Sequence, residues 1–111
     1  MYDWKAKISR LLELPGLTDD QRMGLKTAGV FATWGDDKAV DAMRSHELPI
    51  RDELERLIEA RGWLWTIQKM AAGFDAYVFM ANDELEYAHD CATPAQALMD
   101  ALLSAVKEAQ Q

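Results

Sequence analysis

The sequence contains little cysteine, little proline and glycine, and no long apolar run. One cysteine excludes an internal disulfide framework. Gly and Pro together number nine in 111 residues, and the near-average apolar and charged content is typical of a folded globular chain. The longest uncharged apolar stretch, residues 76–81, is of strand length, well below the ~20 residues that span a bilayer.

The N-terminus lacks the basic segment and apolar segment of a secretory peptide. A single thiol without an export signal predicts a cytoplasmic protein. The length fits one domain, so we expect residues 1–111 to form a single domain, with a helical part at 1–61 and a β-β-β-α part at 62–111.

Basic charge is also scarce. The chain has 12 Lys and Arg against 19 Asp and Glu, a net charge of −7. This balance argues against direct binding to a nucleic-acid backbone, which needs a surplus of basic residues. The excess is localised: residues 71–111 carry one basic and seven acidic residues, a net of −6, whereas residues 1–70 have a net of −1. An acidic surface of this kind either keeps the protein soluble or binds a basic partner.

Apolar residues recur at helical spacing near the N-terminus. Asp3 can cap a first helix that ends near Glu13, before Pro15. Thr18-Asp19-Asp20-Gln21 is a capping box and predicts a second helix to about Thr33. Gly24 and Gly29 lie inside this helix. Each disfavours a helix by about 1 kcal/mol relative to alanine, which predicts either close packing or a break.

Two further helices are expected before the sheet. Asp36 or Asp37 can start a short helix that ends at residues 45–47. Pro49 suits the first turn of the next helix, which Gly62 can end in a left-handed conformation.

After Gly62 the apolar and aromatic residues recur at every second position, which indicates strands. We expect strands at 63–70, 74–81 and 84–88, with a two-residue turn at 82–83. Thr93-Pro94-Ala95-Gln96 combines a threonine cap with proline at the first helical position and predicts a final helix. The predicted class is α+β: a helical N-terminal half followed by α-β-β-β-α, with a three-stranded antiparallel sheet packed by helices.

Trp63 and Trp65 share one face of the first predicted strand. If the final helix covers that face, both are core residues. If it does not, they form an exposed aromatic platform of the kind found at binding surfaces.

No known catalytic motif is present: there is no phosphate-binding glycine loop, no Gly-x-Ser-x-Gly and no His-Glu-x-x-His. His46 and His89 lack partners at metal-ligand spacing. His89 and Cys91 can share one face of a strand, but acidic neighbours make a thiol less reactive. We therefore predict no catalytic residue, no metal and no cofactor, and keep a Cys91–His89 enzyme as an alternative.

The α-β-β-β-α order resembles double-stranded RNA-binding domains in topology only. Those domains place lysines at the start of the last helix, against phosphates. This chain has Thr93-Pro94-Ala95-Gln96 there, preceded by Asp90, which argues against RNA binding. Residues 61–63, 74–78 and 92–98 resemble small phage and prophage proteins of the ABA-sandwich type, and more faintly HicB-type antitoxin domains. That resemblance implies a bacterial or phage origin and a role in binding other proteins.

We therefore expect a small, non-enzymatic protein that binds another protein with a basic surface, without contacting nucleic acid or membrane. The most specific form of this hypothesis is a phage-encoded protein that inhibits a nucleic-acid-binding defence protein of the host. The alternative is a homo-oligomeric structural or accessory protein. The predicted acidic surface is Asp75, Asp83, Glu84, Glu86 and Asp90, with Tyr77 and Tyr87 as aromatic anchors.

Overall fold

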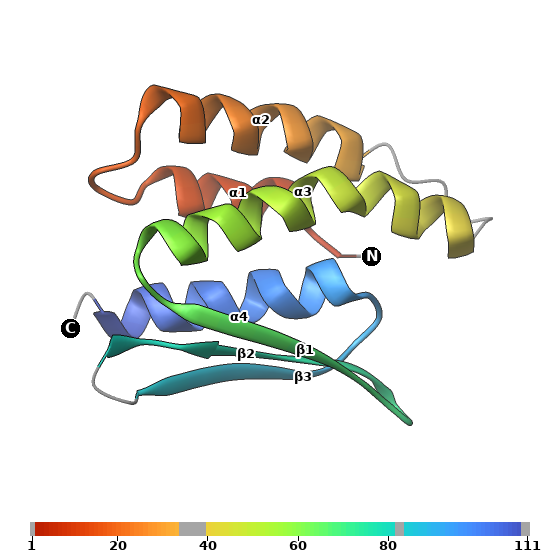
Figure 1. Cartoon of the computed structure of the whole chain (residues 1–111). Helices are drawn as coiled ribbons and strands as arrows, with labels where there is room; N and C mark the ends of the chain where they lie inside the picture. Colours follow the sequence, from red (N-terminus) through yellow and green to blue (C-terminus); the bar gives the residue numbers. More distant parts are fainter. Residues whose placement is uncertain (1, 34–39, 82–83, 110–111) are drawn as a thin grey trace. The chain divides into compact units, whose positions relative to one another are not determined.

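The computed structural model describes residues 2–33, 40–81 and 84–109. These residues form four helices and a three-stranded antiparallel sheet (Figure 1), which confirms the predicted α+β class. The elements are α1 (Trp4–Leu12), α2 (Asp19–Thr33), α3 (Val40–Ala60), β1 (Leu64–Met70), β2 (Gly73–Phe79), β3 (Leu85–Cys91) and α4 (Pro94–Ala109).

The contacts divide the chain into two compact units, Met1–Glu53 and Leu54–Gln111. The division falls inside α3 and not at its C-terminal end, where the sequence suggests a change from helical to β structure. The expectation of one domain stays a prediction.

The predicted caps of α1 and α2 are present in the first unit. The backbone N–H of Ala6 donates to Asp3 Oδ1 at 3.0 Å. The capping box is reciprocal, because Gln21 N–H donates to Thr18 Oγ1 at 3.1 Å and Thr18 N–H donates to Gln21 Oε1 at 2.8 Å. These bonds satisfy backbone donors that the first turn of a helix leaves unpaired.

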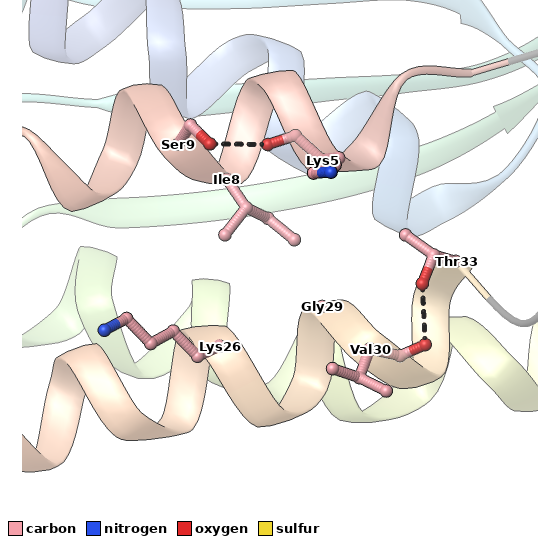
Figure 2. A pocket seen from close by; sticks show the side chains of 7 residues that line it. All are labelled: Lys5, Ile8, Ser9, Lys26, Gly29, Val30 and Thr33. Carbon is pink, nitrogen blue, oxygen red and sulfur yellow. Dashed lines mark hydrogen bonds between the residues drawn. The ribbon is translucent and has the colours of Figure 1, made fainter.

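Both glycines of α2 lie at close approaches, so the helix is packed and not broken there. A Cβ at Gly29 would lie 2.6 Å from Ile8 Cδ1 of α1, and a Cβ at Gly24 would lie 2.5 Å from Glu53 Oε2 of α3. The first of these approaches lies at the centre of the α1–α2 pair (Figure 2). A side chain at either position would therefore require the opposing side chain, Ile8 or Glu53, to shift.

The predicted break at residues 45–47 was wrong. Helix α3 is continuous from Val40 to Ala60 and contains Pro49 in its interior. The predicted start at Asp36 or Asp37 lies outside the described residues. Proline disfavours a helix interior by about 3 kcal/mol, but burying each large aliphatic side chain contributes about 1.5–3 kcal/mol. Four such residues of α3 are at most 4% exposed: Ile50, Leu54, Leu57 and Ile58.

The second unit begins with the C-terminal end of α3. Gly62 has the predicted positive φ, 75°, and Trp63 N–H donates to Ile58 O at 3.2 Å. The three strands follow in the order β1-β2-β3, and the turn expected at residues 82–83 lies outside the described residues. The threonine cap of α4 is confirmed, because Gln96 N–H donates to Thr93 Oγ1 at 3.2 Å.

Helix α4 contacts all three strands and covers one face of the sheet (Figure 1). Ala76 and Val78 of β2 and Leu98 and Leu102 of α4 are fully buried. Trp63 is only 8% exposed and belongs to the core. Trp65 is half-buried, and its indole N–H donates to Glu59 Oε1 at 3.3 Å. Trp63 and Trp65 therefore do not form an exposed platform.

Candidate functional site

The sheet has a second face, opposite α4, which we call the open face. Residues paired directly across antiparallel strands point to the same side. Ala76 and Val78 are buried, so their strand neighbours Tyr77 and Phe79 point to the opposite side. The register adds their partners on the outer strands, which gives two rows: Leu64, Phe79 and Leu85, and Thr66, Tyr77 and Tyr87.

The open face carries large apolar side chains that contact solvent. Leu64 is 69% exposed, Tyr87 52%, Leu85 42% and Phe79 40%. The solvated face of an antiparallel sheet normally carries polar residues. Three of these side chains form one cross-strand row, so they are contiguous and not scattered. A contiguous exposed apolar patch marks an interaction surface.

Aromatic rings continue the open face beside this row. The Tyr87 and His89 ring centroids are 4.5 Å apart, and Tyr77 lies 5.9 Å from His89 and 6.3 Å from Tyr87. Rings of this kind present apolar area with little conformational freedom and retain a polar group for hydrogen bonding. The open face thus combines an aliphatic row with a cluster of three rings.

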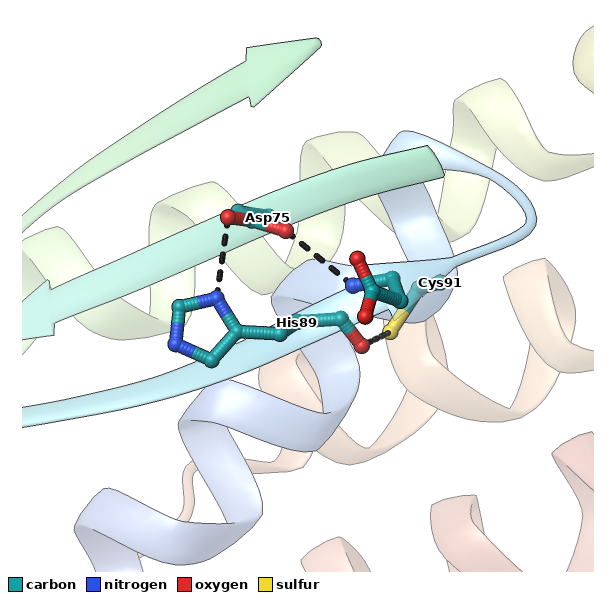
Figure 3. A network of polar contacts seen from close by, with 4 residues as sticks. Asp75, His89 and Cys91 are labelled. Carbon is teal, nitrogen blue, oxygen red and sulfur yellow. Dashed lines mark hydrogen bonds and ion pairs between the residues drawn. The ribbon is translucent and has the colours of Figure 1, made fainter. Parts of the chain in front are cut away.

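A buried carboxylate holds the histidine of this cluster (Figure 3). Asp75 is 5% exposed, and its Oδ2 lies 2.9 Å from His89 Nδ1. Its Oδ1 accepts the backbone N–H of Asp90 at 3.0 Å. The hydrogen bond from His89, and after it the one from Asp90, lowers the pKa of Asp75 below its ordinary value. Asp75 therefore positions His89 and does not contribute an exposed charge.

A bulge in β3 separates His89 from Cys91. Phe74 pairs with Cys91 and Ala76 with Ala88, so Asp75 alone faces both His89 and Asp90. Asp90 accommodates the extra residue at a φ of 57°.

The bulge turns the thiol toward α4, where Cys91 Sγ lies 3.9 Å from Asp100 Oδ2. The same sulfur lies 3.6 Å from the backbone oxygen of His89, while the His89 ring bonds to Asp75 (Figure 3). The expectation that His89 and Cys91 share a face was wrong, because it assumed a strand without a bulge.

The residues of the predicted acidic surface lie in different environments. Glu84 and Asp90 are exposed near opposite ends of β3. Glu86 is half-buried and pairs with Val78, which places it on the α4 side. Asp75 is buried, and Asp83 lies outside the described residues. The four described carboxylates therefore do not form one exposed acidic surface.

The two predicted aromatic anchors, Tyr77 and Tyr87, do lie together on the open face. Sequence reasoning missed Leu64, Leu85 and His89 as members of it. The alternation in β2 already grouped Tyr77 with Phe79, but their neighbours on β1 and β3 depend on the strand register and on the bulge.

Within residues 2–33, 40–81 and 84–109, no group of three or more His, Cys, Asp or Glu residues is placed to hold a metal ion. None of the described helices combines the length and apolarity needed to cross a membrane. No protein-family model, no curated protein and no solved structure matches the chain.

Proposed function

We propose that this chain is a non-catalytic protein-binding module whose binding surface is the open face of its sheet. The cross-strand row of Leu64, Phe79 and Leu85 carries the proposal, because it exposes contiguous apolar area on a folded sheet. Binding sites concentrate their energy in apolar and aromatic residues of this kind, surrounded by polar residues.

The partner we propose is a protein with an apolar pocket and basic surroundings. Residues 71–111 have a net charge of −6, and exposed Glu84 and Asp90 lie near the two ends of β3. Opposite charge would steer the encounter and set its salt dependence, while the apolar row would supply most of the affinity.

A finer proposal is that the partner is a nucleic-acid-binding host protein and that this chain, acting in the cytoplasm, inhibits it. The resemblance of residues 61–63, 74–78 and 92–98 to phage and prophage proteins supports this form, and so does the acidic charge.

Site-specific photocross-linking in a lysate of the source organism tests the binding surface. A photoreactive residue at Thr66, in the open-face row beside that of Leu64, Phe79 and Leu85, should give a discrete adduct whose yield falls with added salt. The matched control places the same residue at Glu108, which is exposed on α4. Equal adducts at both positions, or an adduct that survives the double substitution Leu64→Thr and Leu85→Thr, would contradict the proposal.

A second candidate function is self-assembly. In the part of the chain that the structure describes, β1 and β3 each pair with β2 alone. Their outer edges can therefore accept another strand. Sedimentation velocity at micromolar concentration separates the candidates: a stable oligomer favours self-assembly, and a monomer favours a different partner.

A further inference from the structure

A groove runs between α1 and α2, within the first unit and separate from the open face (Figure 2). Its volume is about 520 Å³, within the range of about 300–1,000 Å³ that is typical of small-molecule sites. Ile8 and Val30 supply apolar surface, and Gly29, against which Ile8 packs, lies between them. The same groove is lined by two lysines, Lys5 from α1 and Lys26 from α2.

Both lysines have ammonium groups that are available to a ligand. Neither is paired with a carboxylate among the residues whose side chains the structure describes, and both side chains are exposed. Residues 4–12 and 21–33 contain five basic residues and no acidic one. The two carboxylates of α2, Asp19 and Asp20, lie in its first turn, six or more residues before Lys26. In a chain of net charge −7, this is a localised site for an anion.

The two lysines lie on either side of the apolar centre. Ile8 meets Gly29 where the antiparallel helices approach most closely. Lys5 precedes Ile8 by three residues and Lys26 precedes Gly29 by three residues, so their backbones lie about 9 Å apart along the groove at 1.5 Å per residue. Figure 2 shows Lys26 and Thr33 near opposite ends of this stretch of α2, with Ile8 pointing between the helices.

We propose that this groove binds a small organic dianion with an apolar middle, of the class of straight-chain dicarboxylates. One carboxylate pairs with Lys5 and the other with Lys26, and the methylene chain lies on Ile8 and Val30. Each exposed ion pair contributes modestly, so recognition depends on both ends being charged and on the spacing between them. The site is independent of the proposed protein-binding face.

Calorimetric and NMR titrations test the proposal, with suberate as the probe. Octanoate has the same chain length with one charge, succinate has two charges on a short spacer, and inorganic phosphate has no apolar part. Suberate should bind severalfold more tightly than each of these compounds, with amide shifts confined to α1 and α2. Equal affinity for octanoate, or equal affinity for succinate or phosphate, would overturn the proposal.

Substitutions then locate the site. Lys5→Gln and Lys26→Gln should each weaken suberate binding about two- to fivefold, whereas Arg10→Gln removes the same charge from α1 outside the groove and should leave it unchanged. Ser9→Trp fills the groove from an exposed position without changing charge, and should abolish binding while helix content by circular dichroism is retained. Suberate binding that persists in Ser9→Trp would place the ligand elsewhere and overturn the proposal.

Discussion

The carboxylate of Asp75 and the imidazole of His89 face each other across β2 and β3, with Oδ2 and Nδ1 2.9 Å apart. The bulge at His89 and Asp90 creates this pair, because it brings two residues of β3 opposite Asp75. The pair fixes a ring that lies against Tyr87, so a polar contact within the fold orients part of the proposed binding surface.

Asp75→Asn should reduce the loss of unfolding free energy that occurs at acidic pH. Hydrogen bonding lowers the pKa of Asp75 in the folded chain below its ordinary value of 3.8. Between the folded and the unfolded pKa, the unfolded chain therefore binds more protons than the folded chain. The stabilisation is therefore present above the unfolded pKa and is lost as pH falls through the folded pKa. Urea unfolding between about pH 5 and about pH 2 should show a smaller loss of free energy for Asp75→Asn than for the wild type.

The control is Glu84→Gln, which removes an exposed carboxylate of the same region and should follow the wild-type curve. If Asp75→Asn loses stability with acid as steeply as the wild type, then Asp75 is not held as an ionised carboxylate by its hydrogen bonds.

Gly29→Ala and Ile8→Val should be coupled. A Cβ at Gly29 would lie 2.6 Å from Ile8 Cδ1, the atom that Ile8→Val removes. Overpacking opposes folding by about 1–3 kcal/mol, partly offset by about 1 kcal/mol from the helix preference of alanine. In a double-mutant cycle measured by urea unfolding, the double variant should therefore be about 1 kcal/mol more stable than the sum of the single changes indicates. Strict additivity would show that the helices separate to admit the methyl group.

Local rules predicted much of the fold. Asp3, Thr18, Gly62 and Thr93 act as the caps that their residue types indicate, because each cap is satisfied within a few residues of sequence. The strands of the β-hairpins were also located, since alternation reflects a sheet with one buried face.

Features that depend on distant contacts were not predicted. The interior position of Pro49 in α3 contradicts its local preference, and burial of Ile50 and its neighbours outweighs that preference. β3 extends past Ala88 through His89, Asp90 and Cys91 because Asp75 of another strand supplies the hydrogen bonds. The open face likewise required the register of three strands.

Pro49→Ala should stabilise the protein. Proline lacks the backbone N–H of an interior helical residue and disfavours that position by about 3 kcal/mol. Replacing it also raises the conformational entropy of the unfolded chain, which lowers the free energy of unfolding by about 0.4–1 kcal/mol. The free energy of unfolding should rise by about 2–2.6 kcal/mol, the balance of these two effects. Pro94→Ala is the matched control, because Pro94 occupies the first position of α4, where proline is favourable. A gain of equal size in both variants would show that the position within the helix has no effect.

The double substitution Leu64→Thr and Leu85→Thr should leave the fold intact and abolish the salt-sensitive adduct formed from Thr66. Both leucines are largely exposed, at 69% and 42%, and surface substitutions usually change stability by less than about 0.5 kcal/mol each. Leu98→Ala, in the fully buried face of α4, should instead lower the free energy of unfolding by about 2–5 kcal/mol.

The contrast separates leucines that maintain the fold from leucines that bind. Urea unfolding measures the first property and cross-linking from Thr66 measures the second. A double variant as unstable as Leu98→Ala would mean that the exposed row is needed for folding. That result would contradict the proposal that the row is exposed in order to bind a partner. A double variant that is stable and no longer cross-links would place the binding energy in the row formed by Leu64, Phe79 and Leu85.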